Sequence, residues 1–177
     1  SSSTQSLYRV IKPYLPDIVI SVECMFTWYW IADFCSAHNI PFVLGHALYM
    51  KAIHGSKTKN DKIDSHKIAA LLRGGMIPMA YVYPAEMRST RDLLRRRMHF
   101  MYKRSELLAH IQNTRSQYNL PEFNKCIARK RNRAGIGEQF EDPSVRKSIE
   151  LNLTLLKQYD ILLNDVELYL TRHAQEN

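Results

Sequence analysis

Residues 17–45 read DIVISVECMFTWYWIADFCSAHNIPFVLG, and this stretch decides the fold. The runs 17–23 and 41–45 are rich in β-branched and other apolar residues, as strands are. Between them, Trp28, Ile31 and Cys35 recur at helical spacing, which predicts a helix over 27–38. A strand, a helix and a second strand form a right-handed crossover unit, so we expect two parallel strands.

Both predicted strands are apolar enough to be buried on two faces, which requires further elements to cover them. Few residues precede the first strand, so the sheet should be completed either by another chain or by an N-terminal part of the natural protein. We favour the second explanation and expect the chain to be a fragment.

Beyond residue 45 the sequence predicts helices. A short one is expected over 46–53, and another should begin at Asp61 or Asp64 and end at Gly74-Gly75. Residues 85–118 have helix-forming composition, and a second long helix should follow Pro143. Apolar spacing in both predicts an antiparallel hairpin, or a coiled coil with another subunit. The expected contact positions are Leu94, Met98, Met101, Leu108 and Ile111, facing Ile149, Asn152, Leu156, Tyr159, Leu163, Val166 and Leu170.

The chain therefore divides into an α/β domain over 1–84 and a helical region over 85–177, with a basic inter-helix loop at 121–142. With 25 Lys and Arg against 17 Asp and Glu, the net charge is +8 and favours a polyanionic partner such as nucleic acid. No apolar run approaches the length of a membrane span. We expect a soluble, cytoplasmic protein that binds no membrane.

Three acids stand in an order that suits metal chemistry. Glu23 ends a predicted strand, where ligands collect on α/β sheets, and Asp61 and Asp64 share one face of a helix start. Oxygen ligands of this kind suit Mg²⁺ or Mn²⁺, which can assist phosphodiester chemistry. The alternatives are that the aspartates cap the helix and that Glu23 is a surface residue.

Basic residues form three candidate contacts with nucleic acid. Lys57, Lys59 and Lys62 surround the two aspartates and could bind phosphate. Arg88, Arg91 and Arg95 share a helical face, which could instead be a solvated surface. The third group lies in the inter-helix loop and comprises Arg129, Lys130, Arg131 and Arg133. We expect this loop to stay mobile until it binds nucleic acid.

The blocks at 22–30, 41–46, 57–64 and 67–73 together resemble the one-ten group of insertion-sequence transposases, to which the Piv-type invertases are similar. The resemblance implies a truncated ribonuclease-H-like, RuvC-like domain with an Asp-Glu-Asp-Asp set, followed by a coiled coil. Glu23 matches the family's Glu, and Asp61 and Asp64 match its closing pair. The first Asp of the set and the C-terminal serine domain have no counterpart in this chain.

This resemblance implies a DNA transposase or site-specific recombinase in which divalent metal assists strand cleavage and exchange. It also implies DNA and a guide (bridge) RNA as partners, a homo-oligomer formed through the helical region, and a bacterial or archaeal, nucleoid-associated location. The fragment alone should be inactive. Two alternatives stay open, a non-catalytic module that binds nucleic acid and oligomerises, and a stand-alone RuvC-like nuclease.

Overall fold

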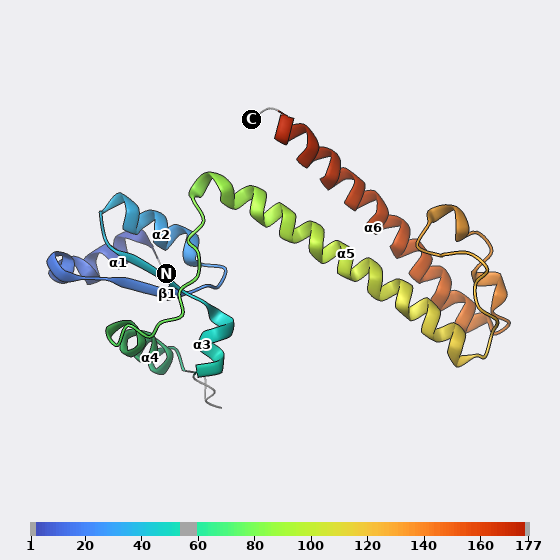
Figure 1. Cartoon of the computed structure of the whole chain (residues 1–177), viewed down its shortest axis with the longest axis horizontal. Coiled ribbons are helices and arrows are strands. Elements are labelled where there is room, and N and C mark those ends of the chain that lie inside the picture. The colour runs from blue at the N-terminus through green and yellow to red at the C-terminus, as the bar shows by residue number, and fades with distance from the viewer. Residues whose placement is uncertain (1–2, 54–59, 176–177) are drawn as a thin grey trace. The chain divides into compact units, whose positions relative to one another are not determined.

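The computed structural model describes residues 3–53 and 60–175 and has mixed α/β architecture (Figure 1). It divides into two compact units, Ser1–Met87 and Arg88–Asn177. The first unit contains α1 (Thr4–Ile11), a 3₁₀ helix η1 (Lys12–Asp17), β1 (Ile20–Glu23), α2 (Trp28–Ala37), β2 (Phe42–Gly45), α3 (Ala47–Ile53) and α4 (Asp61–Arg73).

The predicted strand-helix-strand unit is confirmed. β1 and β2 pair in parallel, with Ile20 opposite Phe42 and Glu23 opposite Gly45. All four residues of β1 are only half-buried in the part of the chain that the structure describes, so the expectation of full burial on both faces is wrong for this strand. The sequence patterns also missed α1, whose N-terminus is capped by the Ser3 hydroxyl accepting a hydrogen bond from the Ser6 amide.

The two faces of the sheet have different neighbours. Ile20 of β1 packs in a cluster with Phe34 and Cys35 of α2, and Val22 packs in a second cluster with Trp28 of the same helix. Side chains alternate between the faces of a strand. Ser21 and Glu23 therefore project from the face opposite α2. In Figure 1, α2 lies above the strands and α4 below them, next to β1.

The second unit is a helical hairpin, as predicted. Its long helices are α5 (Ala85–Gln117) and α6 (Pro143–Gln175), with the 3₁₀ helices η2 (Lys130–Asn132) and η3 (Gly137–Gln139) in the connection. Contacts across the hairpin show antiparallel register. Arg97 Nε donates to Glu167 Oε1 at 2.9 Å, and the Asn152 amide lies 2.9 Å from His110 Nδ1.

The contact face of α5 agrees with the prediction at Leu108 and Ile111, which pack in the hairpin core, and differs from it nearer the start of the helix. Leu94, Met98 and Met101 are 39–47% exposed. There the more buried positions lie one residue earlier, at Leu93, Arg97 and Phe100. The seam then continues through Arg104 and Leu107 to Ile111. Two arginines in this seam interrupt its apolar pattern, which is why hydrophobic periodicity favoured the neighbouring stripe.

The inter-helix loop forms part of a core and is not the mobile segment that its charge suggested. Ile127, Ile136 and Phe140 are at most 3% exposed and pack against Ile111 of α5 and Ile149 of α6. Burial of these apolar side chains stabilises the loop conformation without nucleic acid. None of the helices that the structure describes is both long and apolar enough to cross a bilayer.

Candidate carboxylate site and basic surfaces

Glu23 stands at the carboxyl end of β1. The next residue continues the strand pairing, because the Cys24 amide donates to the Gly45 carbonyl at 2.8 Å. The backbone is thus held on both sides of Glu23, and the pleat directs its half-buried side chain away from α2. This is the side of β1 on which α4 packs.

The two aspartates occupy the first turn of α4. Asn60 caps the helix, since its side-chain oxygen accepts a 2.9 Å hydrogen bond from the Lys62 amide. Asn60, and not either aspartate, is therefore the N-cap. Asp61 is exposed, and Asp64 forms an ion pair with Lys67 at 3.9 Å. Two negative charges at a helix N-terminus are favoured by the helix dipole.

The donor chemistry of these acids suits a hard divalent cation. However, no group of three His, Cys, Asp or Glu side chains close enough to hold a metal occurs within residues 3–53 and 60–175. The described residues therefore do not form a complete metal site by themselves. Whether Glu23, Asp61 and Asp64 act together stays a prediction.

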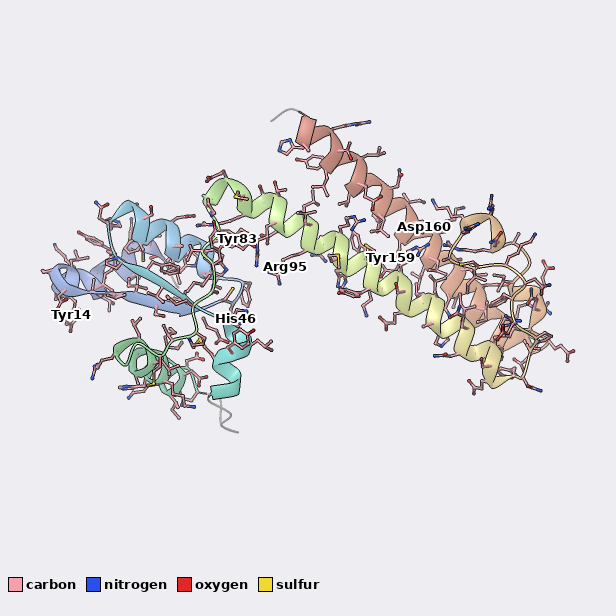
Figure 2. All side chains as sticks on the ribbon, in the orientation of Figure 1. Tyr14, His46, Tyr83, Arg95, Tyr159 and Asp160 are labelled. Carbon is pink, nitrogen blue, oxygen red and sulfur yellow. The ribbon has the colours of Figure 1, made fainter. Side chains whose placement is uncertain are left out.

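Two polar side chains near these acids were not singled out from the sequence. Ser21 Oγ, two residues before Glu23, and His46 Nδ1, directly after β2, are buried and have no hydrogen-bond partner among the residues that the structure describes. His46, labelled in Figure 2, opens the turn into α3. The centroid of its ring lies 4.5 Å from that of the Tyr49 ring. Buried polar atoms without partners are rare, so their presence beside the strand ends marks this edge as a functional candidate.

The lysines expected beside the aspartates are only partly described. Lys62 is exposed in the first turn of α4, whereas Lys57 and Lys59 lie outside the described residues. On α5 the three expected contacts differ in accessibility. Arg95 is exposed and projects on the side away from α6 (Figure 2), and Arg91 pairs with Asp92 at 3.3 Å. Arg88 is 8% exposed, too buried to meet a phosphate as it stands.

On the inter-helix loop, Arg129, Lys130 and Arg131 are exposed, whereas the guanidinium nitrogens of Arg133 are occupied by contacts within the hairpin. Arg133 was predicted to bind nucleic acid, and this is corrected by its contacts. Its Nη1 donates to Asp160 Oδ2 at 2.6 Å, and its Nε and Nη2 donate to the carbonyls of Ile127 and Ala128 at 2.9 Å. Each of its three side-chain nitrogens thus donates within the hairpin, two to the loop backbone and one to α6.

A second arginine, Arg104, also donates to Asp160. Arg104 Nε donates to Asp160 Oδ1 at 2.7 Å, and its Nη2 donates to the Ala128 carbonyl at the same distance. Burial by itself would raise the pKa of the Asp160 carboxyl, but hydrogen bonds from Arg104 and Arg133 outweigh it, so the pKa lies below its ordinary value. This Arg-Asp-Arg cluster joins α5, α6 and the loop.

Acids at a strand end and a helix start, together with a hairpin that presents basic side chains, are features expected of a protein that processes nucleic acid. The comparisons define the family within that class. Residues 16–119 match the family model of DEDD transposases of the IS110 type, described as transposase. The match covers more than half of the chain, so the chain belongs to this transposase family. No curated protein and no solved structure matches it significantly.

Proposed function

We propose that this chain takes part in DNA strand cleavage and exchange, with Glu23, Asp61 and Asp64 at the reaction centre. The observation that carries the proposal is the direction of Glu23. The pleat of β1 turns its carboxylate to the face on which α4 packs, and α4 begins with the two aspartates. All three acids fall within the segment that matches the transposase family.

The proposed cofactor is Mg²⁺ or Mn²⁺. Magnesium in such sites is commonly bound by one or two carboxylates together with substrate phosphates. DNA phosphates could therefore complete a ligand set that the described acids leave incomplete. When bound, the ion would stabilise negative charge on the reacting phosphate. Exposed Lys62, in the same helical turn as the aspartates, would contact the phosphate backbone.

The proposed fold of the first unit is RuvC-like, which the parallel pair β1 and β2 and the helix between them support. DNA and a guide RNA are the proposed partners, and the exposed Arg129, Lys130 and Arg131 are the surface we assign to them. Basic side chains of this kind neutralise backbone phosphates. We place the protein at the nucleoid of a bacterial or archaeal cell.

A homo-oligomer formed through the helical unit belongs to the same proposal. On α6, four apolar side chains spaced four or seven residues apart lie on one face of the helix and are 41–55% exposed. They are Leu151, Leu155, Leu162 and Tyr169. They form a second stripe that does not face α5. Such a stripe is typical of a helix that packs against another helix.

A second function is favoured by a specific observation. Because the described acids do not gather into a group that could hold a metal, the chain could instead bind nucleic acid and oligomerise without catalysing cleavage. The third possibility, a stand-alone RuvC-like nuclease, requires cleavage by this chain alone.

Manganese binding separates these functions. Mn²⁺ would be titrated into the chain with and without branched DNA, and followed by electron paramagnetic resonance. For the proposed function we expect Mn²⁺ binding that strengthens with DNA and is lost in the Glu23→Gln, Asp61→Asn, Asp64→Asn triple variant. Asp17→Asn with Glu86→Gln is the control, since both acids belong to the first unit and lie outside the proposed site.

The outcome assigns the function. DNA binding with no manganese bound specifically in either protein would contradict the reaction-centre assignment and leave the binding module. DNA cleavage by the isolated chain, abolished by the triple substitution, would establish the nuclease instead.

A further inference from the structure

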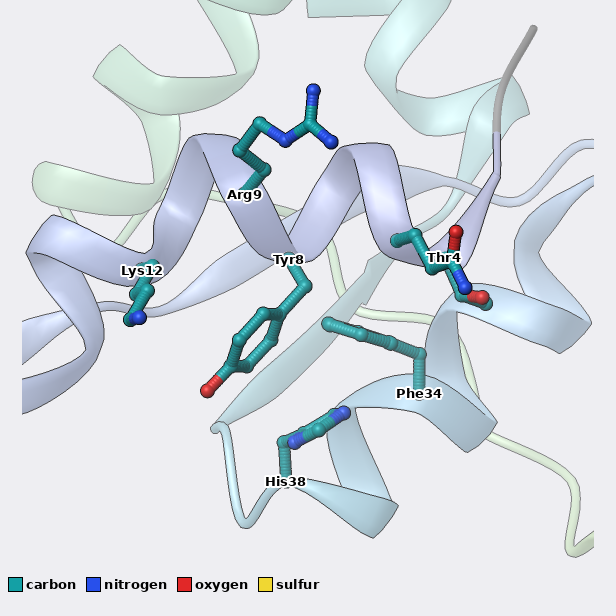
Figure 3. Close-up of a pocket in the computed structure, with 7 residues that line it drawn as sticks. Thr4, Tyr8, Arg9, Lys12, Phe34 and His38 are labelled. Atoms are coloured by element: carbon teal, nitrogen blue, oxygen red, sulfur yellow. The ribbon is translucent and has the colours of Figure 1, made fainter.

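A pocket of about 420 Å³ opens in the first unit between α1 and the end of α2. Thr4, Tyr8 and Lys12 border it from successive turns at the start of the chain, and Phe34 and His38 border it from α2 (Figure 3). Both helices contribute to the cluster on the α2 side of the sheet. The pocket is therefore separate from the face to which Glu23 points.

Three aromatic rings form one wall of this pocket. The ring centroids of Tyr8 and His38 are 5.0 Å apart at an interplanar angle of 33°, and those of Phe34 and His38 are 4.5 Å apart. Tyr8 extends from α1 toward the two α2 rings (Figure 3). His38 is exposed, whereas Phe34 is buried and supports it. The wall thus presents a supported ring at the surface, as a stacking platform requires.

The remaining lining is basic and polar. Arg9 and Lys12 are exposed and both border the pocket, and the Arg9 guanidinium projects from α1 on the side away from the three rings (Figure 3). Gln5 adds an amide and Thr4 a hydroxyl, both of which can donate and accept hydrogen bonds. None of the described residues that line the pocket is an acid. A ligand that fits this lining has a flat ring with polar edges and carries negative charge.

We propose that this pocket binds one nucleotide of a single-stranded nucleic acid. The base stacks on the Tyr8–His38 wall, its polar edge meets Gln5 or Thr4, and its phosphates meet Lys12 and, once its exposed side chain has rotated toward the pocket, Arg9. The strand must be single because the faces of bases in a duplex are already covered by their neighbours. The proposal rests on nucleic-acid binding by the family function and adds a site on the opposite face of the sheet.

Photo-crosslinking of the full chain tests this placement. Single-stranded DNA and RNA oligonucleotides containing 5-iodouracil would be irradiated with the protein, and the modified peptides identified by mass spectrometry. We expect a crosslink at Tyr8 or His38, and the polymer that forms it identifies the strand as DNA or RNA. Crosslinks confined to other segments with both polymers would overturn the proposal.

Affinity measurements give an independent readout. His38→Ala combined with Arg9→Gln and Lys12→Gln should weaken binding of the crosslinked oligonucleotide by about tenfold or more, given the usual contribution of one stacked base and two phosphate contacts. Tyr14→Ala combined with Arg73→Gln and Lys147→Gln is the control, because it removes one exposed aromatic ring and two charges outside the pocket. Equal weakening by both variants would contradict a specific site.

Duplex DNA distinguishes the two proposals. Retention of duplex binding by the pocket variant, with loss of single-strand binding, supports the pocket and leaves the proposed function intact. A wild-type chain that binds duplex but never crosslinks at the pocket overturns only the pocket. A chain that binds neither polymer overturns both.

Discussion

Nη1 of Arg133 donates a 2.6 Å hydrogen bond to Oδ2 of Asp160, and this contact joins the hairpin loop to the middle of α6. Arg104 completes the cluster from α5. The Asp160 side chain is 7% exposed, and that of Arg133 is 9% exposed. A buried charge cluster of this kind requires all its members, because any one left alone is poorly solvated.

Replacing Asp160 should therefore destabilise the hairpin strongly. Asp160→Asn leaves two arginines without their counter-charge, and we expect a loss of about 3–5 kcal/mol in the free energy of unfolding. Asp165→Asn is the control, since this acid is exposed on the same helix. Urea denaturation followed by circular dichroism measures both. A loss below about 1 kcal/mol for Asp160→Asn would contradict a stabilising role for the cluster.

Acid pH should weaken the same cluster. The pKa of Asp160 is lower in the folded protein than in the unfolded chain, so its contribution to stability is complete above the unfolded value and is lost as pH falls through the folded value. With an unfolded pKa of about 3.9, the loss begins below about pH 5. Unfolding measured from pH 7 to pH 3 should show a steeper decline for the wild type than for Asp160→Asn. Parallel declines would disagree with this assignment.

The register of the hairpin can be tested with two truncations on α5. Ile111 is fully buried, so Ile111→Ala should cost about 2–5 kcal/mol through lost burial and the cavity it leaves. Met98 is 42% exposed and outside the seam, so Met98→Ala should cost well under 1 kcal/mol. Comparable losses in both variants would indicate that Met98 is covered in solution, as a helix of a second subunit would do.

The exposed loop residues Arg129, Lys130 and Arg131 should dominate the salt dependence of duplex binding. Substituting Arg129, Lys130 and Arg131 with Gln removes up to three phosphate contacts. The plot of log binding constant against log salt concentration should therefore become shallower, its negative slope losing up to about 3 in magnitude. A charge-matched control substitutes the exposed Lys147, Lys157 and Arg172. Fluorescence anisotropy over a salt series distinguishes the two. An equal change in both slopes would show that overall charge, and not these loop residues, determines binding.

Local patterns in the sequence predicted the helices and strands well where one physical signal dominated. β-branched runs indicated β1 and β2, and the Gly74-Gly75 pair indicated the end of α4, where Gly75 takes a positive φ of 66°. The long helices followed from composition and from Pro143. These features depend on residues close in sequence, and so they can be recognised there.

The candidate site was predictable only in part. Glu23 and the α4 aspartates could be named from their positions in the chain, but the side of the sheet to which Glu23 points follows from the packing of Ile20 and Val22 against α2. The unpartnered atoms of Ser21 and His46 have no sequence signal, because burial without a partner is a property of the assembled structure.

The sequence by itself determined the basic character of this protein, its strand-helix-strand unit and its two long helices, because charge and periodicity are local properties. Tertiary structure alone decided which arginines are free to meet a polyanion. Arg131 and Arg133 stand two residues apart in one basic run, yet only Arg133 faces the Asp160 carboxylate. The partner that occupies a charged side chain can be distant in sequence, and only folding brings the two together.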